Sequence, residues 1–166
     1  WMAARECVHA GMKTCMLQDG GGASPWVHGF NVPIHPGDSS DAFLHDTLRS
    51  GQGLSDFKLA SALCYDAIDI FKSLQDMGLS FNREGDGYQL LQPLGASNPR
   101  VASIGNETGL AVLRALRNEL TGSVLEKSET RAVRLLTEDG RVVGAIAYSR
   151  RDSEWLQISS RATILA

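Results

Sequence analysis

The chain has 166 residues, of which 43% are hydrophobic and 21% charged, a balance typical of a globular protein and not of a disordered one. Its formal net charge of −3 gives no electrostatic support to nucleic-acid binding, and no apolar run approaches the roughly 20 residues that a membrane-spanning helix needs. The three cysteines, Cys7, Cys15 and Cys64, are widely spaced and show no metal-ligand pattern. We therefore expect buried free thiols and no metal site.

The N-terminal part predicts one helix and one strand before a long loop. Residues 3–10 have a helical pattern that ends at Gly11, and residues 14–17 are typical of a buried strand. Residues 18–38 form a loop rich in Gly, Ser and Pro. A loop of that length within a compact domain is more often functional than merely connecting.

Three further helices are predicted over residues 41–50, 56–77 and 107–120. Glycines are expected to end them, at Gly51, Gly78 and Gly122. The middle helix is the longest, and its apolar residues recur at helical spacing, which predicts one buried face. These residues are Ala60, Leu63, Cys64, Ala67, Phe71 and Leu74.

From Val124 onward the pattern changes from helices to strands. A first strand is followed by three more over residues 130–136, 141–148 and 155–160, which predict a three-stranded meander with a tight turn at 138–141. Residues 162–166 are apolar and predict a core strand of a parallel sheet. The fold class is therefore α/β (mixed α+β), with a helical block inserted between parts of a sheet.

Six segments carry short motifs in a fixed order. They are 37–47 (GDSSDAFLHDT), 74–83 (LQDMGLSFNR), 86–87 (DG), 107–110 (ETGL), 137–145 (TEDGRVVGA) and 162–166 (ATILA). In this order and at this spacing the segments resemble the flavoprotein subunits of fumarate reductase and succinate dehydrogenase, together with L-aspartate oxidase.

The resemblance implies a domain plan. Residues 1–36 would form part of a Rossmann-like FAD-binding domain, 37–110 a mainly helical capping domain, and 111–166 a return to the FAD-binding domain with the meander and the core strand. The first helix would follow a glycine-rich phosphate loop, and the last strand would precede a cofactor-binding turn. We therefore expect an internal fragment of a flavoprotein, inactive alone, whose cytoplasmic or membrane-peripheral location is left open because any leader would precede the chain.

The resemblance also implies a set of residues that bind FAD. Gln18 stands where dinucleotide-binding folds usually carry an acid for the ribose hydroxyls, with Asp19 beside it, although a polar strand end is the alternative. The glycine run that follows would offer backbone N–H groups to the flavin and its phosphates, or else be only a flexible loop. The predicted cofactor-binding residues are Gln18, Asp19, Gly20, Gly21, Gly22, Ala23, Ser24, His28, Gly29 and Ala132.

Respiratory members of this family bind FAD covalently through a His that follows a Ser. Here Ser24 is followed by Pro25, whose tertiary nitrogen is no nucleophile. The resemblance therefore implies FAD held without a covalent bond. His28 follows a few residues later and is expected either near the flavin or as a solvated side chain.

The substrate edge implied by the resemblance departs from the dicarboxylate pattern. The residues expected there are Leu94, Gly95, Ser97, Thr108 and Leu110. Leu110 stands where dicarboxylate members place a His, and Leu94 where they place a Phe. A carboxylate loses a charge-assisted hydrogen bond against Leu, which favours a less charged substrate or a carboxylate held elsewhere. Arg100 is expected as a surface charge, with anion binding as the alternative.

The leading hypothesis is an FAD-dependent oxidoreductase that transfers hydride between the flavin and a small organic substrate, and whose further partner is an electron-transfer subunit. No catalytic residue is assigned, because the family's proton-delivering Arg and Thr-Glu pair would lie beyond Ala166. One alternative is a non-catalytic lid or interaction module. Another is an L-aspartate oxidase, against which Leu110 counts because that family typically has Arg there.

Overall fold

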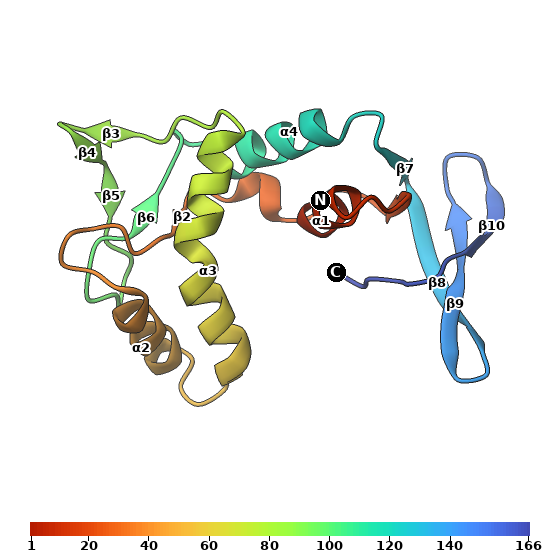
Figure 1. Ribbon diagram of the computed structural model, residues 1–166, viewed down its shortest axis with the longest axis horizontal. Coiled ribbons are helices and arrows are strands. Elements are labelled where there is room, and N and C mark those ends of the chain that lie inside the picture. The colour runs from red at the N-terminus through yellow and green to blue at the C-terminus, as the bar shows by residue number, and fades with distance from the viewer. The chain divides into compact units, whose positions relative to one another are not determined.

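The computed structural model describes residues 1–166, which form two compact units. The terminal unit contains Trp1–Gly22 and Leu116–Ala166, and the central unit contains Ala23–Ala115. Helix α4 (Thr108–Leu120) runs from one unit into the other. The predicted mixed α/β class is confirmed (Figure 1). The central unit includes the predicted capping region 37–110, whose role as a cap stays a prediction.

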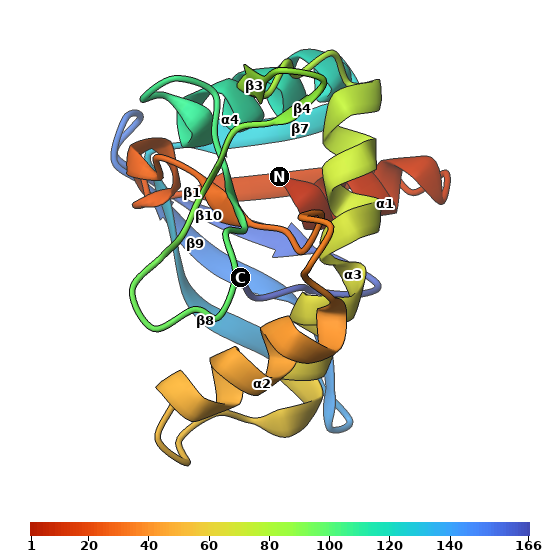
Figure 2. The same ribbon diagram turned by 90° about the vertical axis from the view of Figure 1, so that its left-hand side faces the viewer.

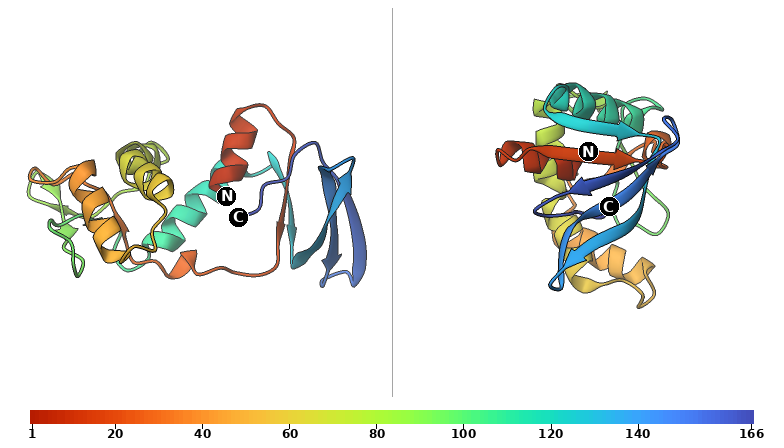
Figure 3. Two further views of the ribbon diagram at one scale, coloured as in Figure 1. Left: turned by 90° about the horizontal axis from the view of Figure 1, so that it is seen from below. Right: turned by 90° about the vertical axis from the view of Figure 1, so that its right-hand side faces the viewer.

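The terminal unit combines one helix with two small sheets. Helix α1 (Met2–His9) leads through Gly11, at φ +73°, into β1 (Thr14–Gln18), which pairs in parallel with β7 (Val124–Ser128). Strands β8 (Thr130–Glu138), β9 (Arg141–Ser149) and β10 (Glu154–Ser159) form the predicted meander in the order β10–β9–β8 (Figure 3). Asp139 and Gly140 both have positive φ, as a tight hairpin turn between right-twisted strands requires.

The expectation of a last core strand is wrong. Residues 162–166 pair with no strand of this chain, and Ile164 and Leu165 are 62% and 72% exposed. An apolar run becomes a strand only where a neighbouring strand takes its backbone groups. Cys15 is also exposed rather than buried, whereas Cys64 is buried and all three thiols are free.

Two long helices dominate the central unit. Helix α2 (Ser40–Ser50) packs beside α3 (Phe57–Asp76), as Figure 2 shows. Each has a side-chain cap, because Ser39 accepts the Ala42 N–H at 3.1 Å and Asp56 accepts the Leu59 N–H at 3.0 Å. Their shared core consists of Phe43, Leu44, Ala60, Cys64 and Ala67.

A second core lies between α3 and short strands. The strands are β2 (Phe30–Asn31), β5 (Leu90–Leu91) and β6 (Val101–Ala102), in the order β2–β6–β5, and a separate hairpin joins β3 (Arg83–Glu84) to β4 (Gly87–Tyr88). The buried side chains of this core are Val32, Phe71, Leu74, Leu79, Phe81 and Ala102. A short 3-10 helix, η1 (Ser24–Trp26), and β2 occupy part of the region predicted as loop.

Two details of the helices differ from expectation. Leu63 is 61% exposed, so the predicted buried face of α3 is narrower than the apolar pattern suggested. Gly78 and Gly122 follow their helices at positive φ, but Gly51 is right-handed, at φ −72°, and the chain turns at Gln52 and Gly53 instead. No helix of the chain combines the length and the apolar content needed to cross a membrane.

Candidate cofactor and substrate site

The end of β1 presents an unsatisfied acceptor. The Gln18 side chain donates its amide N–H to the Gly20 carbonyl at 3.0 Å, which fixes the orientation of the amide. Its Oε1 atom is buried and has no hydrogen-bond partner. A buried acceptor without a partner destabilises the fold unless a ligand or water satisfies it, so Gln18 is placed to receive a donor from outside the chain.

Asp19, the neighbouring candidate, is already engaged. Arg131 on β8 donates to its Oδ2 at 2.5 Å, and Arg150 approaches its Oδ1 at 2.9 Å. These two guanidinium groups come from the meander and neutralise the carboxylate. Asp19 therefore ties the end of β1 to the meander through charge, although its Oδ1, like the Oε1 of Gln18, is buried and accepts no hydrogen bond.

The glycine run that follows β1 has a backbone that no other group of the chain covers. Gly20 has φ +117°, and a Cβ placed on Gly20, Gly21 or Gly22 would have no atom within 4 Å. None of these three amides donates to another group of the chain. Such consecutive free N–H groups are the feature that anionic oxygens bind in glycine-rich loops. Ala132, on β8, is exposed in the same unit.

The remaining predicted cofactor residues belong to the central unit and gather around the start of α4. The Thr108 hydroxyl donates to the His28 carbonyl at 2.5 Å and accepts the Ile104 N–H at 2.8 Å. The His28 ring lies with Nδ1 3.0 Å from the Asn106 carbonyl, which requires a proton on that nitrogen. Sequence reasoning assigned Thr108 and His28 to different ligands, whereas the structure joins them directly.

Close backbone contact explains two of the glycines at this point. A Cβ on Gly109 would lie 1.8 Å from the Ser24 carbonyl oxygen, and one on Gly29 would lie 2.7 Å from the Ala102 oxygen. The Gly109 N–H also donates to the Val27 carbonyl at 2.8 Å. Ala23 and Ser24 are exposed beside this contact, and Leu110 is half-buried in the first turn of α4.

The predicted substrate residues Leu94, Gly95 and Ser97 lie on a turn beside α2 and share no hydrogen bond with Thr108 or Leu110. The Leu94 side chain is fully exposed, at 105% of its reference area, and Gly95 has φ +81°. The structure therefore does not join the five predicted substrate residues into one bonded cluster.

Arg100 is buried, which corrects its expected place on the surface. Only 1% of it is exposed, and its guanidinium donates twice to Asp38, at 2.9 Å each, and lies 3.0 Å from Asp46. The group also lies over the Phe43 ring. Two carboxylates make burial of this cation tolerable, because a buried charge needs paired opposite charge and hydrogen bonds.

Sequence reasoning missed both partners, although Asp38 and Asp46 stand in the motif at 37–47. Burial alone raises the pKa of the Asp46 carboxyl, but hydrogen bonds from Ser97 and the charges of Arg100 and Arg49 lower it overall, below its ordinary value of 3.8. Asp46 is therefore a carboxylate held ionised within the central unit.

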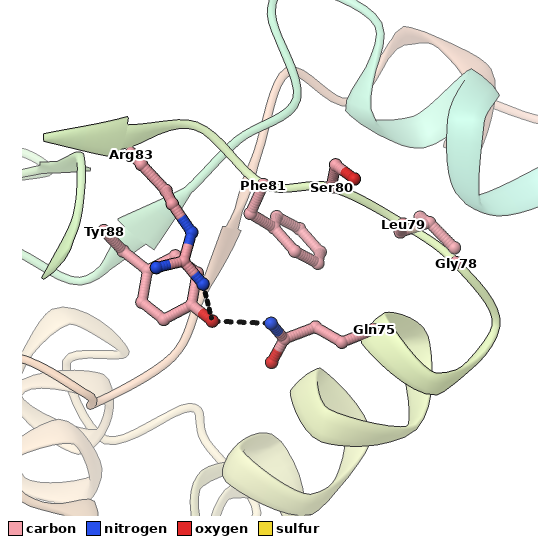
Figure 4. Close-up of a pocket in the computed structure, with 7 residues that line it drawn as sticks. All are labelled: Gln75, Gly78, Leu79, Ser80, Phe81, Arg83 and Tyr88. Carbon is pink, nitrogen blue, oxygen red and sulfur yellow. Dashed lines mark hydrogen bonds between the residues drawn. The ribbon is translucent and has the colours of Figure 1, made fainter. Parts of the chain in front are cut away.

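The central unit also has a pocket of about 420 Å³ at the C-terminal end of α3. Figure 4 shows the Tyr88 hydroxyl accepting hydrogen bonds from Gln75, at 2.5 Å, and Arg83, at 3.4 Å. The Arg83 guanidinium lies 4.8 Å from the centre of the Tyr88 ring. None of the residues predicted for cofactor or substrate lines this pocket.

Several curated proteins resemble the chain. It is 33% identical over 135 residues to one component of the fumarate reductase (CoM/CoB) of Methanothermobacter marburgensis, covering 80% of this chain and 25% of that protein. It is 31% identical over 147 residues to L-aspartate oxidase 2 of Ralstonia nicotianae, covering 87% of this chain and 27% of that protein. The chain thus spans about a quarter of the length of these relatives.

Solved structures share the fold at lower identity. The apo Sdh1 complex of Mycobacterium smegmatis matches with a TM-score of 0.87 at 22% identity, covering 96% of this chain and 31% of that one. E. coli quinol fumarate reductase matches with a TM-score of 0.83 at 19% identity, covering 95% and 28%. The predicted resemblance is confirmed, and because the family model described as "FAD binding domain" matches residues 1–166 throughout, the chain belongs to that family.

Proposed function

We propose that the chain is part of an FAD-dependent oxidoreductase related to fumarate reductase, succinate dehydrogenase and L-aspartate oxidase. FAD is the cofactor of the matched family. The observation that carries the proposal beyond the family match is the buried, unpartnered Oε1 of Gln18 beside the open amides of residues 20–22. An acceptor and a row of donors fit a ligand that has both hydroxyl groups and phosphate oxygens.

In this proposal the chain's own residues bind and orient the cofactor. Gln18 accepts a ribose hydroxyl, and the amides of Gly20, Gly21 and Gly22 donate to anionic oxygens, while Asp19 holds the strand end to the meander. For the central unit, taken by itself, we propose that Ala23, Ser24, His28 and Gly29 contact the cofactor. When bound, FAD supplies hydride transfer.

For the substrate we propose a small organic molecule that faces Thr108, Leu110 and the turn at residues 94–97. Apolar Leu94 and Leu110 support a substrate less charged than a dicarboxylate, or one whose carboxylate is bound elsewhere. The 31% identity to an L-aspartate oxidase keeps oxidation of an amino acid as the second candidate. An electron-transfer subunit remains the proposed protein partner.

Titration of FAD into the 166-residue chain tests the proposal. We expect quenching of flavin fluorescence and a dissociation constant that rises about 3- to 10-fold in Gln18→Ala, because one hydrogen bond to the ligand is lost. Gln157→Ala is the matched control, since Gln157 is an exposed glutamine of β10 in the same unit. Absence of quenching would favour the alternative of a non-catalytic lid, and equal effects of the two substitutions would remove Gln18 from the site.

A further inference from the structure

The turn at residues 93–97 carries a leucine whose side chain is fully exposed to solvent. This residue is Leu94, and the amide of Ala96 closes the turn by donating to the Pro93 carbonyl at 3.1 Å. A short exposed turn with an apolar tip would normally be mobile. Here two charged residues of α2 form hydrogen bonds with its backbone.

Two residues one helical turn apart on α2, Asp46 and Arg49, form hydrogen bonds with the backbone of the turn. The Asp46 carboxylate accepts the Ser97 N–H and the Ser97 hydroxyl, both at 2.7 Å. The Arg49 guanidinium donates to the Gly95 carbonyl at 2.5 Å and to Asp46 at 2.9 Å. The same ion pair therefore satisfies a donor and an acceptor two residues apart in the turn.

Arg100 holds the Asp46 carboxylate in place through a buried ion pair. Its guanidinium lies 3.0 Å from the Asp46 oxygen that receives Ser97, while two further N–H groups bind Asp38 just before α2. The Asp46 and Asp38 side chains are 5% and 0% exposed. Buried, fully paired charges have one favoured geometry, because any other arrangement leaves a charge without a partner.

We propose that Asp46 and Arg49 are positioning residues that hold the turn at 93–97 in one conformation and so fix where Leu94 is presented. The inference rests on the proposed function in assigning the turn to the substrate edge. The bracing itself follows from the contacts of the central unit.

Amide hydrogen exchange of the 166-residue chain tests the bracing without any flavin. Arg49→Met is the decisive variant, because the Arg49 side chain is 55% exposed and its loss should leave the fold intact. We expect the Ser97 amide to exchange about 3- to 10-fold faster, with no change for amides in the middle of α3. Arg49→Lys, which retains a cationic donor, should restore most of the protection.

Lys72→Met is the matched control. Lys72 pairs with Asp69 at the same helical spacing, at 3.2 Å, and is 66% exposed, but it contacts no turn. Unchanged Ser97 exchange in Arg49→Met, equal acceleration in Lys72→Met, or failure of Arg49→Lys to restore protection would each overturn the proposal. Because these measurements need no cofactor, their outcome is independent of the FAD titration that tests the proposed function.

Discussion

The buried guanidinium of Arg100 shows how a single charge organises the central unit. It is paired with Asp38 and Asp46, so Arg100→Met would leave two buried carboxylates without their cation. We expect the free energy of unfolding to fall by about 3–5 kcal/mol, measured by urea denaturation. Arg114→Met is the control, because the Arg114–Glu107 pair is 66% and 68% exposed and should contribute less than about 1 kcal/mol. Similar losses in both variants would contradict this account.

Asp46 makes the same network sensitive to acid. Its pKa in the folded chain lies below the ordinary value of 3.8, so its contribution to stability is complete above that value and is lost as the pH falls through the lowered pKa. We expect the free energy of unfolding to decrease as the pH drops below about 4. Asp38, Arg49 and Arg100 are the charged groups that face it. In Asp46→Asn this acid-dependent loss should be smaller, and an unchanged pH profile would show that Asp46 is not its source.

At the scale of elements, α3 supports the central unit through one side only. Phe71 is 3% exposed, and the centre of its ring lies 4.6 Å from the ring centre of Phe81 and 5.1 Å from that of Tyr88. Phe71→Ala should therefore reduce the free energy of unfolding by about 3–5 kcal/mol. Leu63→Ala, on the same helix but 61% exposed, should change it by less than about 0.5 kcal/mol. A large loss for Leu63→Ala would mean that this side of α3 is covered in solution.

The contact between η1 and α4 gives a second test at this scale. Gly109 leaves no room for a side chain, since a Cβ would lie 1.8 Å from the Ser24 oxygen. Gly109→Ala should separate η1 from the start of α4 and increase proteolysis of the segment around Ser24. Gly21→Ala is the control, because a Cβ there would meet nothing within 4 Å. Equal protection in both variants would argue against a rigid contact.

Local sequence patterns predicted most helices and strands. The features that they did not predict depend on residues far away in the sequence. Helical spacing predicted α3 and the Asp139–Gly140 turn predicted the β8–β9 hairpin, because both depend on neighbouring residues. The burial of Arg100 depends on Asp38, 62 residues away, and no local signal marks that pairing. Residues 162–166 have the composition of a core strand, yet strand formation requires a pairing edge that the pattern cannot specify.

At the scale of the whole molecule, the predicted cofactor residues divide between the two units. Gln18, the glycine run and Ala132 lie in the terminal unit, whereas Ala23, Ser24, His28 and Gly29 lie in the central unit. The division follows the chain, since the boundary falls within the glycine-rich segment itself, after Gly22. The family model matches residues of both units.

The final prediction concerns how the whole molecule holds its flavin. Pro25 lies in the first turn of η1, directly after Ser24, and its acylated ring nitrogen cannot attack a flavin. The His28 Nδ1 faces the Asn106 carbonyl at 3.0 Å, so this nitrogen carries a proton and is committed within the central unit. Acid precipitation of the FAD-loaded protein should therefore leave the yellow flavin in the supernatant. Flavin that stays with the precipitate in the wild type but not in His28→Ala would instead identify the other ring nitrogen of His28 as a covalent attachment point.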